Sequence, residues 1–310
     1  MTNDDVVQWL LEGDAAIQYQ VRRDLLGEEQ RDLQERIATE GWGERFLQAR
    51  RDNGHWGRGF YQPKWISSHY TLLDLRYLEL PRDHAAPAET IGLILRDQKA
   101  EDGGINPGKT IKESDVCVNG MFLTYACYFG TAETDLHSIV DFIIGQQMAD
   151  GGFNCQSNRS GADHSSLHST ISILEGIHEY VVRGYDYRLG ELQAIAAQAR
   201  EFILLHRLFR SDHTGEIINK GFLMLSYPSR WYYDILRALV YFQAAGIDYD
   251  ARMQDGLDVL QEKRRKDGTW PVQAKHSGQV HFDMEKTGGP SRWNTLRALR
   301  VLRRYAPDFV

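Results

Sequence analysis

A glycine-rich turn recurs along this 310-residue chain, and it constrains the fold more than any other feature of the sequence. In each copy an acidic, amide or hydroxyl residue precedes the glycine, and an aromatic or aliphatic residue follows. The steps between the aligned glycines are 49, 48, 64 and 53 residues. Spacing of this size is typical of a repeated helix pair. The aligned glycines are Gly54, Gly103, Gly151, Gly215 and Gly268.

Each turn is followed by a polar loop and then by a segment with apolar residues at helical spacing. Second helices of the pairs are expected at residues 89–96, 136–147, 192–208 and 251–263. No segment alternates between polar and apolar residues over a sustained run, so few strands are expected. The sequence Pro-Ser-Arg-Trp occurs at 228–231 and again at 290–293. The first helices begin near His69, Cys117, His168, Trp231 and Trp293.

The first fifty residues depart from this repeat. Residues 6–26 read as two short helices broken at Glu12-Gly13-Asp14, with Asp14 as the N-cap of the second. Because terminal repeats are usually atypical, we predict a helical cap over residues 1–45 and repeats over residues 46–310. No linker rich in Pro, Gly or Ser interrupts the chain, so a single domain over residues 1–310 is expected.

Charge and composition narrow the classes of partner. A net charge of -7 without a basic tail argues against nucleic acid. No apolar run approaches the roughly 20 residues of a membrane-spanning helix, and the N-terminus lacks the pattern of a signal peptide. We therefore expect a cytoplasmic protein. The odd number of cysteines, Cys117, Cys127 and Cys155, argues against a disulfide framework.

The turn at residues 147–153, Gln-Met-Ala-Asp-Gly-Gly-Phe, resembles the repeat of squalene and oxidosqualene cyclases and of protein prenyltransferase β subunits. The resemblance covers roughly residues 45–305. It implies an all-α fold, an α/α toroid of about five helix pairs, with the active site in a central funnel at the starts of the inner helices. The acidic Asp-x-Asp-Asp cluster of the cyclases is missing, and the nearest string is Asp248-Tyr249-Asp250. Squalene cyclisation is therefore not expected.

The segment from residue 109 to residue 117 resembles a pattern of the prenyltransferase β subunits. By that resemblance, Lys109 and Lys112 hold a diphosphate, and Asp115 and Cys117 bind zinc. The implied third zinc ligand is the histidine at the equivalent position of the next inner helix, His168. Independently, these three residue types are good Zn²⁺ ligands, and three protein ligands leave the open position that catalysis requires.

The match to that family is incomplete. Lys109 stands where the family has arginine, and Val118 stands where it has tyrosine. The family's enzymes also require a partner subunit, which this chain would have to find elsewhere. The plain alternative is that Asp115 is a helix N-cap and Cys117 a small core residue.

Other residues of the inner helix starts suit the same funnel. Tyr70 matches a tyrosine that contacts the diphosphate in the family, and His69 is expected to line the cavity rather than to bind metal. His164 lies four residues before His168 and is a reserve ligand if the segment is helical. Arg230, Trp231 and Trp293 are candidate substrate-binding residues of the later repeats. Further aromatic residues that could line the funnel are Trp65, Tyr227, Tyr232 and Trp270.

A second candidate site lies in the polar loop over residues 276–286. His281 and Asp283 are groups suited to acid–base catalysis, and the loop precedes the last inner helix. The alternative is a solvated loop without a chemical role.

These observations lead to three hypotheses of function. The first is a prenyltransferase- or terpene cyclase-like enzyme, zinc-dependent at Cys117, that acts on a small apolar or diphosphate-bearing substrate. The second is a non-catalytic toroid that binds a small ligand or a partner protein. The third is a metal-independent lyase or cyclase that uses the loop at residues 276–285.

Overall fold

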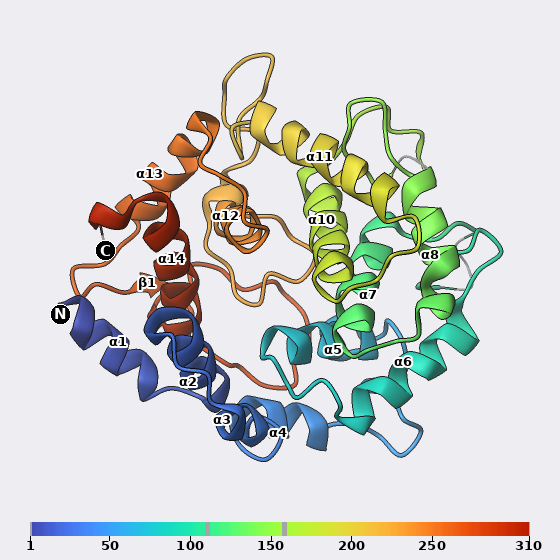
Figure 1. The fold of residues 1–310 in the computed structure, drawn as a ribbon, viewed down its shortest axis with the longest axis horizontal. Helices are drawn as coiled ribbons and strands as arrows, with labels where there is room; N and C mark the ends of the chain where they lie inside the picture. The colour runs from blue at the N-terminus through green and yellow to red at the C-terminus, as the bar shows by residue number, and fades with distance from the viewer. Residues whose placement is uncertain (1, 109–111, 157–159, 310) are drawn as a thin grey trace. The chain divides into compact units, whose positions relative to one another are not determined.

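The computed structural model describes residues 2–108, 112–156 and 160–309, and this part of the chain is predominantly helical (Figure 1). It contains thirteen α-helices. Strands β1 (Trp270–Pro271) and β2 (Pro290–Ser291) pair antiparallel, with Trp270 opposite Ser291. The prediction of an all-α fold with few strands is confirmed, whereas closure of the helices into a toroid stays a prediction.

The chain groups into two compact units. Unit 1 comprises Met1–Gln48, Leu78–Pro81 and Leu204–Val310. Unit 2 comprises Ala49–Tyr77 and Arg82–Ile203. Both units contain predicted helix pairs, so the grouping does not follow the boundary expected at residue 45. The single domain over residues 1–310 stays a prediction.

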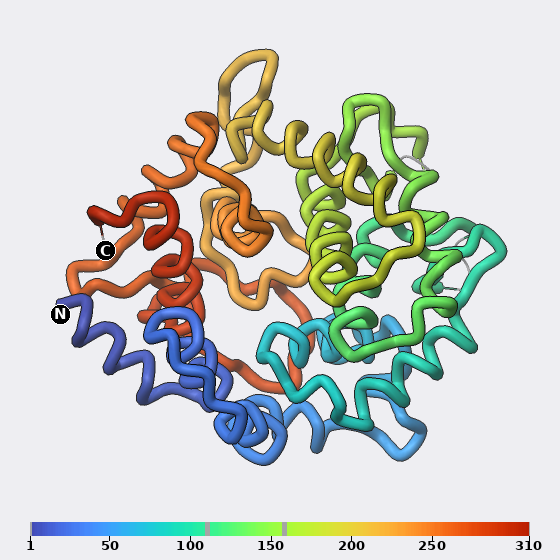
Figure 2. The backbone as a smooth tube through the Cα atoms, viewed as in Figure 1, coloured from blue at the N-terminus to red at the C-terminus, as the bar shows by residue number. Residues whose placement is uncertain are grey.

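Two helices of unit 2, α7 and α10, run side by side (Figure 2). Their approach depends on glycine. A Cβ added to Gly120 would lie 2.5 Å from the Ser172 carbonyl oxygen, and one added to Gly176 would lie 2.5 Å from the Gly120 carbonyl oxygen. Both distances are far inside van der Waals contact, so larger residues would force the helices apart. The elements of unit 2 are η2 (Lys64–Ile66), α5 (Ser68–Tyr77), α6 (Ala85–Gln98), α7 (Val116–Tyr128), α8 (Glu133–Gly145), α10 (Leu167–Val182) and most of α11 (Leu189–Leu205).

Unit 1 contains segments from both ends of the described chain. Its first helices, α1 (Asn3–Leu11) and α2 (Ala15–Val21), are the two predicted helices, and the Asp14 carboxylate caps the second by accepting the Ala16 N–H at 3.0 Å. Both contact α14 (Arg292–Tyr305), since Arg292 Nε donates to the Trp9 carbonyl at 3.0 Å and Arg300 Nη2 donates to Gln20 Oε1 at 2.7 Å. The N-terminal segment therefore shares a core with the last predicted repeat.

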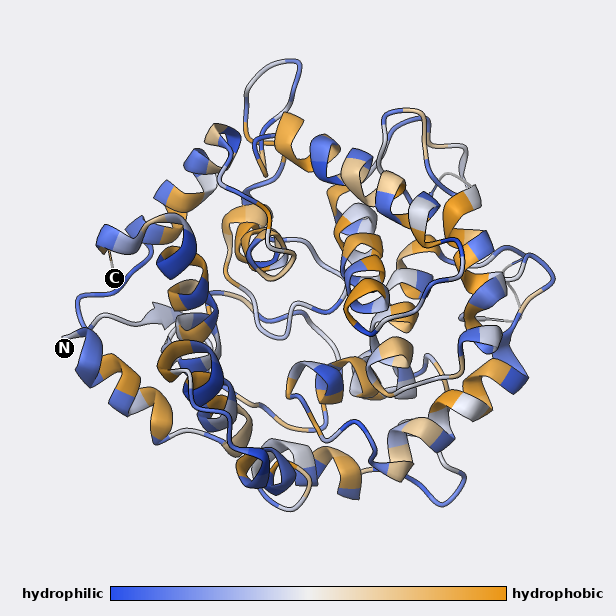
Figure 3. Cartoon of the chain, viewed as in Figure 1, coloured by the Kyte–Doolittle hydropathy of each residue, from blue (hydrophilic) through white to orange (hydrophobic). Residues whose placement is uncertain are grey.

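Among the other elements of unit 1, helices α3 and α4 were not expected from the sequence. Figure 3 shows mixed hydrophilic and hydrophobic turns along α1, as expected of a helix with one buried face. These remaining elements are η1 (Arg22–Leu26), α3 (Arg31–Arg36), α4 (Gly41–Gln48), η3 (Lys220–Leu223), α12 (Ile235–Ala244), η4 (Ala251–Met253), α13 (Gln254–Glu262) and η5 (Pro307–Phe309).

The glycine-rich turns have one shared geometry. In the turn of Gly103, the Gly103 N–H donates to the Ala100 carbonyl at 3.0 Å, and the Ala100 N–H donates to the Gly104 carbonyl at 2.9 Å. The turns at residues 51–55, 148–152 and 265–269 repeat both hydrogen bonds. The turn at 211–216 is one residue longer, which explains its weaker sequence match. All five aligned glycines have φ between 73° and 89°, a conformation that favours glycine.

Side chains attach several of these turns to the helix that follows. The Asp102 carboxylate accepts the Ser114 N–H at 2.7 Å and the Ser114 hydroxyl at 2.8 Å, just before α7. Asp150 holds Ser165 before α10 in the same way. These contacts fix where α7 and α10 begin. A backbone N–H of the turn also donates to a polar side chain four residues after the helix N-cap. The donor and acceptor residues are Ile105 and Asn119, Phe153 and Thr170, and Trp270 and Thr295.

One predicted helix start is wrong. Helix α12 begins at Ile235 and not near Trp231, because Asp234 is its N-cap and accepts the Arg237 N–H at 2.8 Å. Arg230 has φ of 57°, which is incompatible with a right-handed helix. In the second Pro-Ser-Arg-Trp string, by contrast, Ser291 is the N-cap of α14. The two identical strings therefore have different conformations.

Candidate functional site

Three candidate residues have the same position in three helices of unit 2. His69, Cys117 and His168 are each the second residue of their helix, in α5, α7 and α10. Trp293 has that position in α14 of unit 1. The equivalence predicted from the repeat is confirmed for these four residues, and it fails for Trp231, which lies before α12.

His69 is fully buried, and its two ring nitrogens have different surroundings. Its Nδ1 lies 3.1 Å from the hydroxyl oxygen of Tyr125 in α7, which is also fully buried. A buried hydroxyl hydrogen needs an acceptor, so we assign the Tyr125 O–H as the donor and place the imidazole proton on Nε2. That Nε2 has no hydrogen-bond partner among the described residues. Burial, reinforced by the charge of Lys64, lowers the pKa of His69 to about 3, so the ring is neutral.

Aromatic rings surround His69. The ring centroids of Phe60, Tyr61 and Tyr70 lie 5.4, 5.5 and 4.8 Å from that of His69. Trp65 packs edge-on against Tyr70 at 4.8 Å, and the hydroxyls of Tyr61 and Tyr70 lie 3.2 Å apart. Burial raises the pKa of Tyr61, and the neighbouring Cys117 adds to the shift, so the phenol is protonated. The cluster around His69 is thus mostly apolar, with a few hydroxyl and imidazole groups.

Cys117 meets Cys155, a contact that the sequence-based predictions did not include. The Cys117 backbone N–H, in the first turn of α7, donates to Cys155 Sγ at 3.0 Å. The Ser169 hydroxyl donates to the same sulfur at 3.3 Å, and the Cys155 N–H donates back to the Ser169 oxygen at 3.1 Å. A hydrogen bond with the Cys117 thiol, helped by that from Ser169, lowers the pKa of Cys155 despite its burial. No sequence motif signals this contact, because Cys155 lies in the loop before α10.

The three implied zinc ligands lie at the starts of α7 and α10. Asp115 is the N-cap of α7 and is 8% exposed, but its side chain makes no capping hydrogen bond. Cys117 and His168 are half-buried in the first turns of α7 and α10. Across residues 2–108, 112–156 and 160–309, no three His, Cys, Asp or Glu side chains are arranged to hold a metal ion. Zinc binding therefore stays a prediction, and no chemical step is derived from it.

The predictions for the charged residues and the second histidine near this site compare differently with the structure. Lys109 lies outside the described residues. Lys112 is exposed, three residues before the N-cap of α7. His164 precedes α10, which starts at Leu167, so it does not share a helix face with His168. It is exposed and pairs with Asp163 at 3.0 Å, so the reasoning that made it a reserve ligand was wrong.

The second candidate site, in the loop before α14 in unit 1, is less compact than expected. His281 packs edge-on against Phe46, with ring centroids 5.6 Å apart. Burial, with a contribution from the charge of Arg230, lowers the pKa of His281 to about 4, so the ring is neutral. The Asp283 carboxylate is 63% exposed and pairs with Lys275 at 2.8 Å. A solvent-exposed, ion-paired carboxylate is a poor general base.

Glu285, in the same loop, was missed as a functional residue. Its carboxylate accepts the Trp293 N–H at 3.1 Å and a hydrogen bond from the Ser291 hydroxyl. Burial raises the pKa of Glu285, although these hydrogen bonds oppose the shift. It positions the first turn of α14. No spacing in the sequence distinguishes it from the neighbouring polar residues.

The predicted substrate-binding residues of unit 1 pack against other rings. Trp293 is 4% exposed and lies 5.0 Å from Tyr227 by ring centroids. Trp231, Tyr232 and His276 form a continuous stack with centroid separations of 3.8 and 3.7 Å. Arg230 is buried. Whether any of them binds a substrate stays a prediction.

Comparison with known proteins does not assign a family. No family model matches the chain, and no curated protein matches it. Among the described residues, no helix is both long and apolar enough to cross a bilayer.

Proposed function

We propose that this chain is a prenyltransferase- or terpene cyclase-like enzyme, in which the helix pairs close into an α/α toroid around an isoprenoid or similarly apolar substrate. The proposed site lies at the starts of α5, α7 and α10. The observation that carries the proposal is His69, a buried imidazole whose Nε2 has no hydrogen-bond partner among the described residues.

An unpaired buried N–H costs about 1–3 kcal/mol, and such groups are rare in native proteins. Tyr125 fixes the tautomer of His69, so Nε2 is available as a donor to an oxygen atom of a ligand. A ligand oxygen at this nitrogen would remove the cost. The same position one helix pair later in the chain is Cys117, which supports a site shared by several repeats.

The surroundings of His69 suit an apolar ligand. The rings of Phe60, Tyr61 and Tyr70 pack against His69, and aromatic surface of this kind packs against hydrocarbon and stabilises positive charge. In the proposal, Lys112, close before α7, receives an anionic end of the substrate. Zinc, if bound at Asp115, Cys117 and His168, would hold a thiolate nucleophile and lower the pKa of its thiol.

Calorimetric titration of the purified chain tests this proposal. Farnesyl diphosphate, farnesol and inorganic diphosphate are the probes, and each is titrated before and after dialysis against a chelator. We expect saturable binding of farnesyl diphosphate, weakened at least about tenfold in His69→Gln, which corresponds to about 1.4 kcal/mol. His164→Ala changes an exposed loop histidine and should bind like the parent.

The outcomes separate the competing functions. Equal binding by His69→Gln and His164→Ala, or no binding of either farnesyl compound, would refute the site. Binding without any product, with zinc or without it, would favour the non-catalytic toroid. Metal analysis of the same samples tests whether zinc is bound. The zinc site would be refuted if the protein contained no stoichiometric zinc and its Cys117→Ser variant were equally stable.

A further inference from the structure

Two of the three cysteines lie together at the start of α7, and we propose that Cys117 and Cys155 form a reversible disulfide, which makes this pair a site of oxidative modification. The inference goes beyond the proposed function and does not depend on it. It also runs against the expectation from the odd cysteine count, because that count does not show which two cysteines meet.

The geometry places both residues within reach of a bond. Cys155 Sγ lies 3.0 Å from the Cys117 backbone nitrogen. One covalent bond separates that nitrogen from the Cys117 Cα, and one side chain separates the sulfur from the Cys155 Cα. The two Cα atoms are therefore no more than roughly 7 Å apart, which is about the upper limit for a disulfide. The Cys155 sulfur therefore lies against the first turn of α7, beside Cys117.

The exposure of the three cysteines distinguishes this pair from the third. Cys117 and Cys155 are half-buried residues, whereas Cys127, ten residues further along α7, is completely buried. The Cys155 sulfur accepts two hydrogen bonds, from the first turn of a 13-residue helix and from the Ser169 hydroxyl. These two contacts hold the Cys155 sulfur in place next to Cys117.

The reaction needs an oxidant, and a hydroperoxide is the class we propose. The Cys155 thiolate attacks one peroxide oxygen, the O–O bond breaks, and a sulfenic acid and hydroxide form. The Cys117 thiolate then attacks the sulfenic sulfur, forming the S–S bond and releasing a second hydroxide. The two thiol protons convert both hydroxides to water. The sulfur pair loses two electrons and the peroxide gains them, and a dithiol reverses the step by exchange.

Thiol counting and peptide mapping test the proposal on the full chain. The reduced protein should have three titratable thiols in denaturant and, after hydrogen peroxide treatment, one. Mass spectrometry of a non-reduced digest should find the Cys117 and Cys155 peptides joined, and dithiothreitol should separate them. The matched variant Cys127→Ala should lose both of its thiols, whereas Cys155→Ser should form no intramolecular link. Circular dichroism of each variant checks that it is folded.

Three results would overturn the proposal. One is retention of three thiols after peroxide treatment. Another is a linkage that involves Cys127 or joins two chains. The last is stoichiometric zinc in the purified protein together with full protection of Cys117 and Cys155 from peroxide, which would assign the pair to metal binding instead.

Discussion

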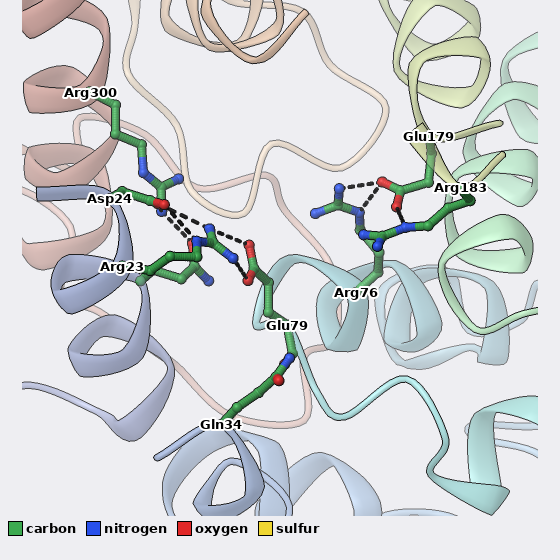
Figure 4. Close-up of polar contacts among 9 residues, drawn as sticks. Arg23, Asp24, Gln34, Arg76, Glu79, Glu179, Arg183 and Arg300 are labelled. Atoms are coloured by element: carbon green, nitrogen blue, oxygen red, sulfur yellow. Dashed lines mark hydrogen bonds and ion pairs between the residues drawn. The ribbon is translucent and has the colours of Figure 1, made fainter. Parts of the chain in front are cut away.

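Glu179 of α10 is a carboxylate buried between two arginines of unit 2, and it determines how that unit responds to acid. Its oxygens accept Arg183 Nε at 2.6 Å and Arg76 Nε at 3.0 Å, and only 1% of the residue is exposed (Figure 4). Burial alone would raise the pKa of Glu179, but the two guanidinium groups outweigh it and the pKa is lowered. The carboxylate is therefore ionised in the folded protein.

We expect Glu179→Gln to lower the free energy of unfolding by about 3 kcal/mol, because it leaves two arginines without their buried counter-charge. Since the folded pKa lies below the ordinary value of 4.5, the stability that Glu179 contributes is present above that pH and is lost as pH falls through the folded pKa. Urea unfolding at about pH 7, pH 5 and pH 3 should show the difference between parent and variant shrinking with acid.

Glu191→Gln is the control for that experiment. Glu191 pairs with Arg188 at the surface, at 2.7 Å, and 56% of its side chain is exposed. Ion pairs of this kind contribute little, so no measurable change is expected at any of the three pH values. A loss for Glu179→Gln no larger than that of the control would contradict the role given to the buried carboxylate.

At the same scale, the sequence could predict some site residues and not others. His69, Cys117 and His168 were predictable because apolar residues at helical spacing mark where each helix starts, and the three residues have the same position relative to that start. Cys155 was not, because its contact with Cys117 depends on the path of a loop whose length differs between repeats. Glu285 was missed for the same reason, since its partners belong to a helix start and not to a pattern of spacing.

At the scale of elements, the close approach of α7 and α10 rests on two glycines. We expect Gly120→Ala to lower the free energy of unfolding by about 2–3 kcal/mol, because the new Cβ would lie 2.5 Å from the Ser172 carbonyl oxygen. Gly92→Ala in α6 is the matched control, because it is exposed and a Cβ there meets nothing within 4 Å. It should be neutral or stabilising by up to about 1 kcal/mol, since alanine favours helix. Chemical denaturation measures both, and equal effects would refute the close approach.

The elements themselves were largely predictable, and the exceptions have physical causes. Apolar residues at helical spacing located α5, α7, α10 and α14. The start of α12 was misplaced because an identical four-residue string, at residues 228–231 and 290–293, takes its conformation from the residues on its C-terminal side. Asp234 supplies a better N-cap three residues beyond the first copy. Helix α3 was missed because six residues give too short a period to recognise.

At the scale of the whole chain, unit 1 assembles from three segments, and no local pattern shows which of them meet. Asp24, in the first segment, pairs with Arg23 at 2.6 Å and with Arg300 in the last, while Arg23 pairs with Glu79 at 2.9 Å in the middle segment (Figure 4). The side chains in this network are partly buried, so their charges are poorly screened by solvent. The network therefore joins residues that are far apart in sequence.

We expect Asp24→Asn to lower the free energy of unfolding by about 3 kcal/mol, because it leaves Arg23 and Arg300 without the charge that lies between them. Hydrogen exchange should locate the loss in unit 1, with faster exchange in α2 and α14 and unchanged protection in α7 and α10. Glu28→Gln, which removes a surface partner of Arg22, is the control and should cost about 1 kcal/mol or less. Equal loss of protection in both units would show that they unfold together, and no loss in α14 would show that the pair with Arg300 carries no stability.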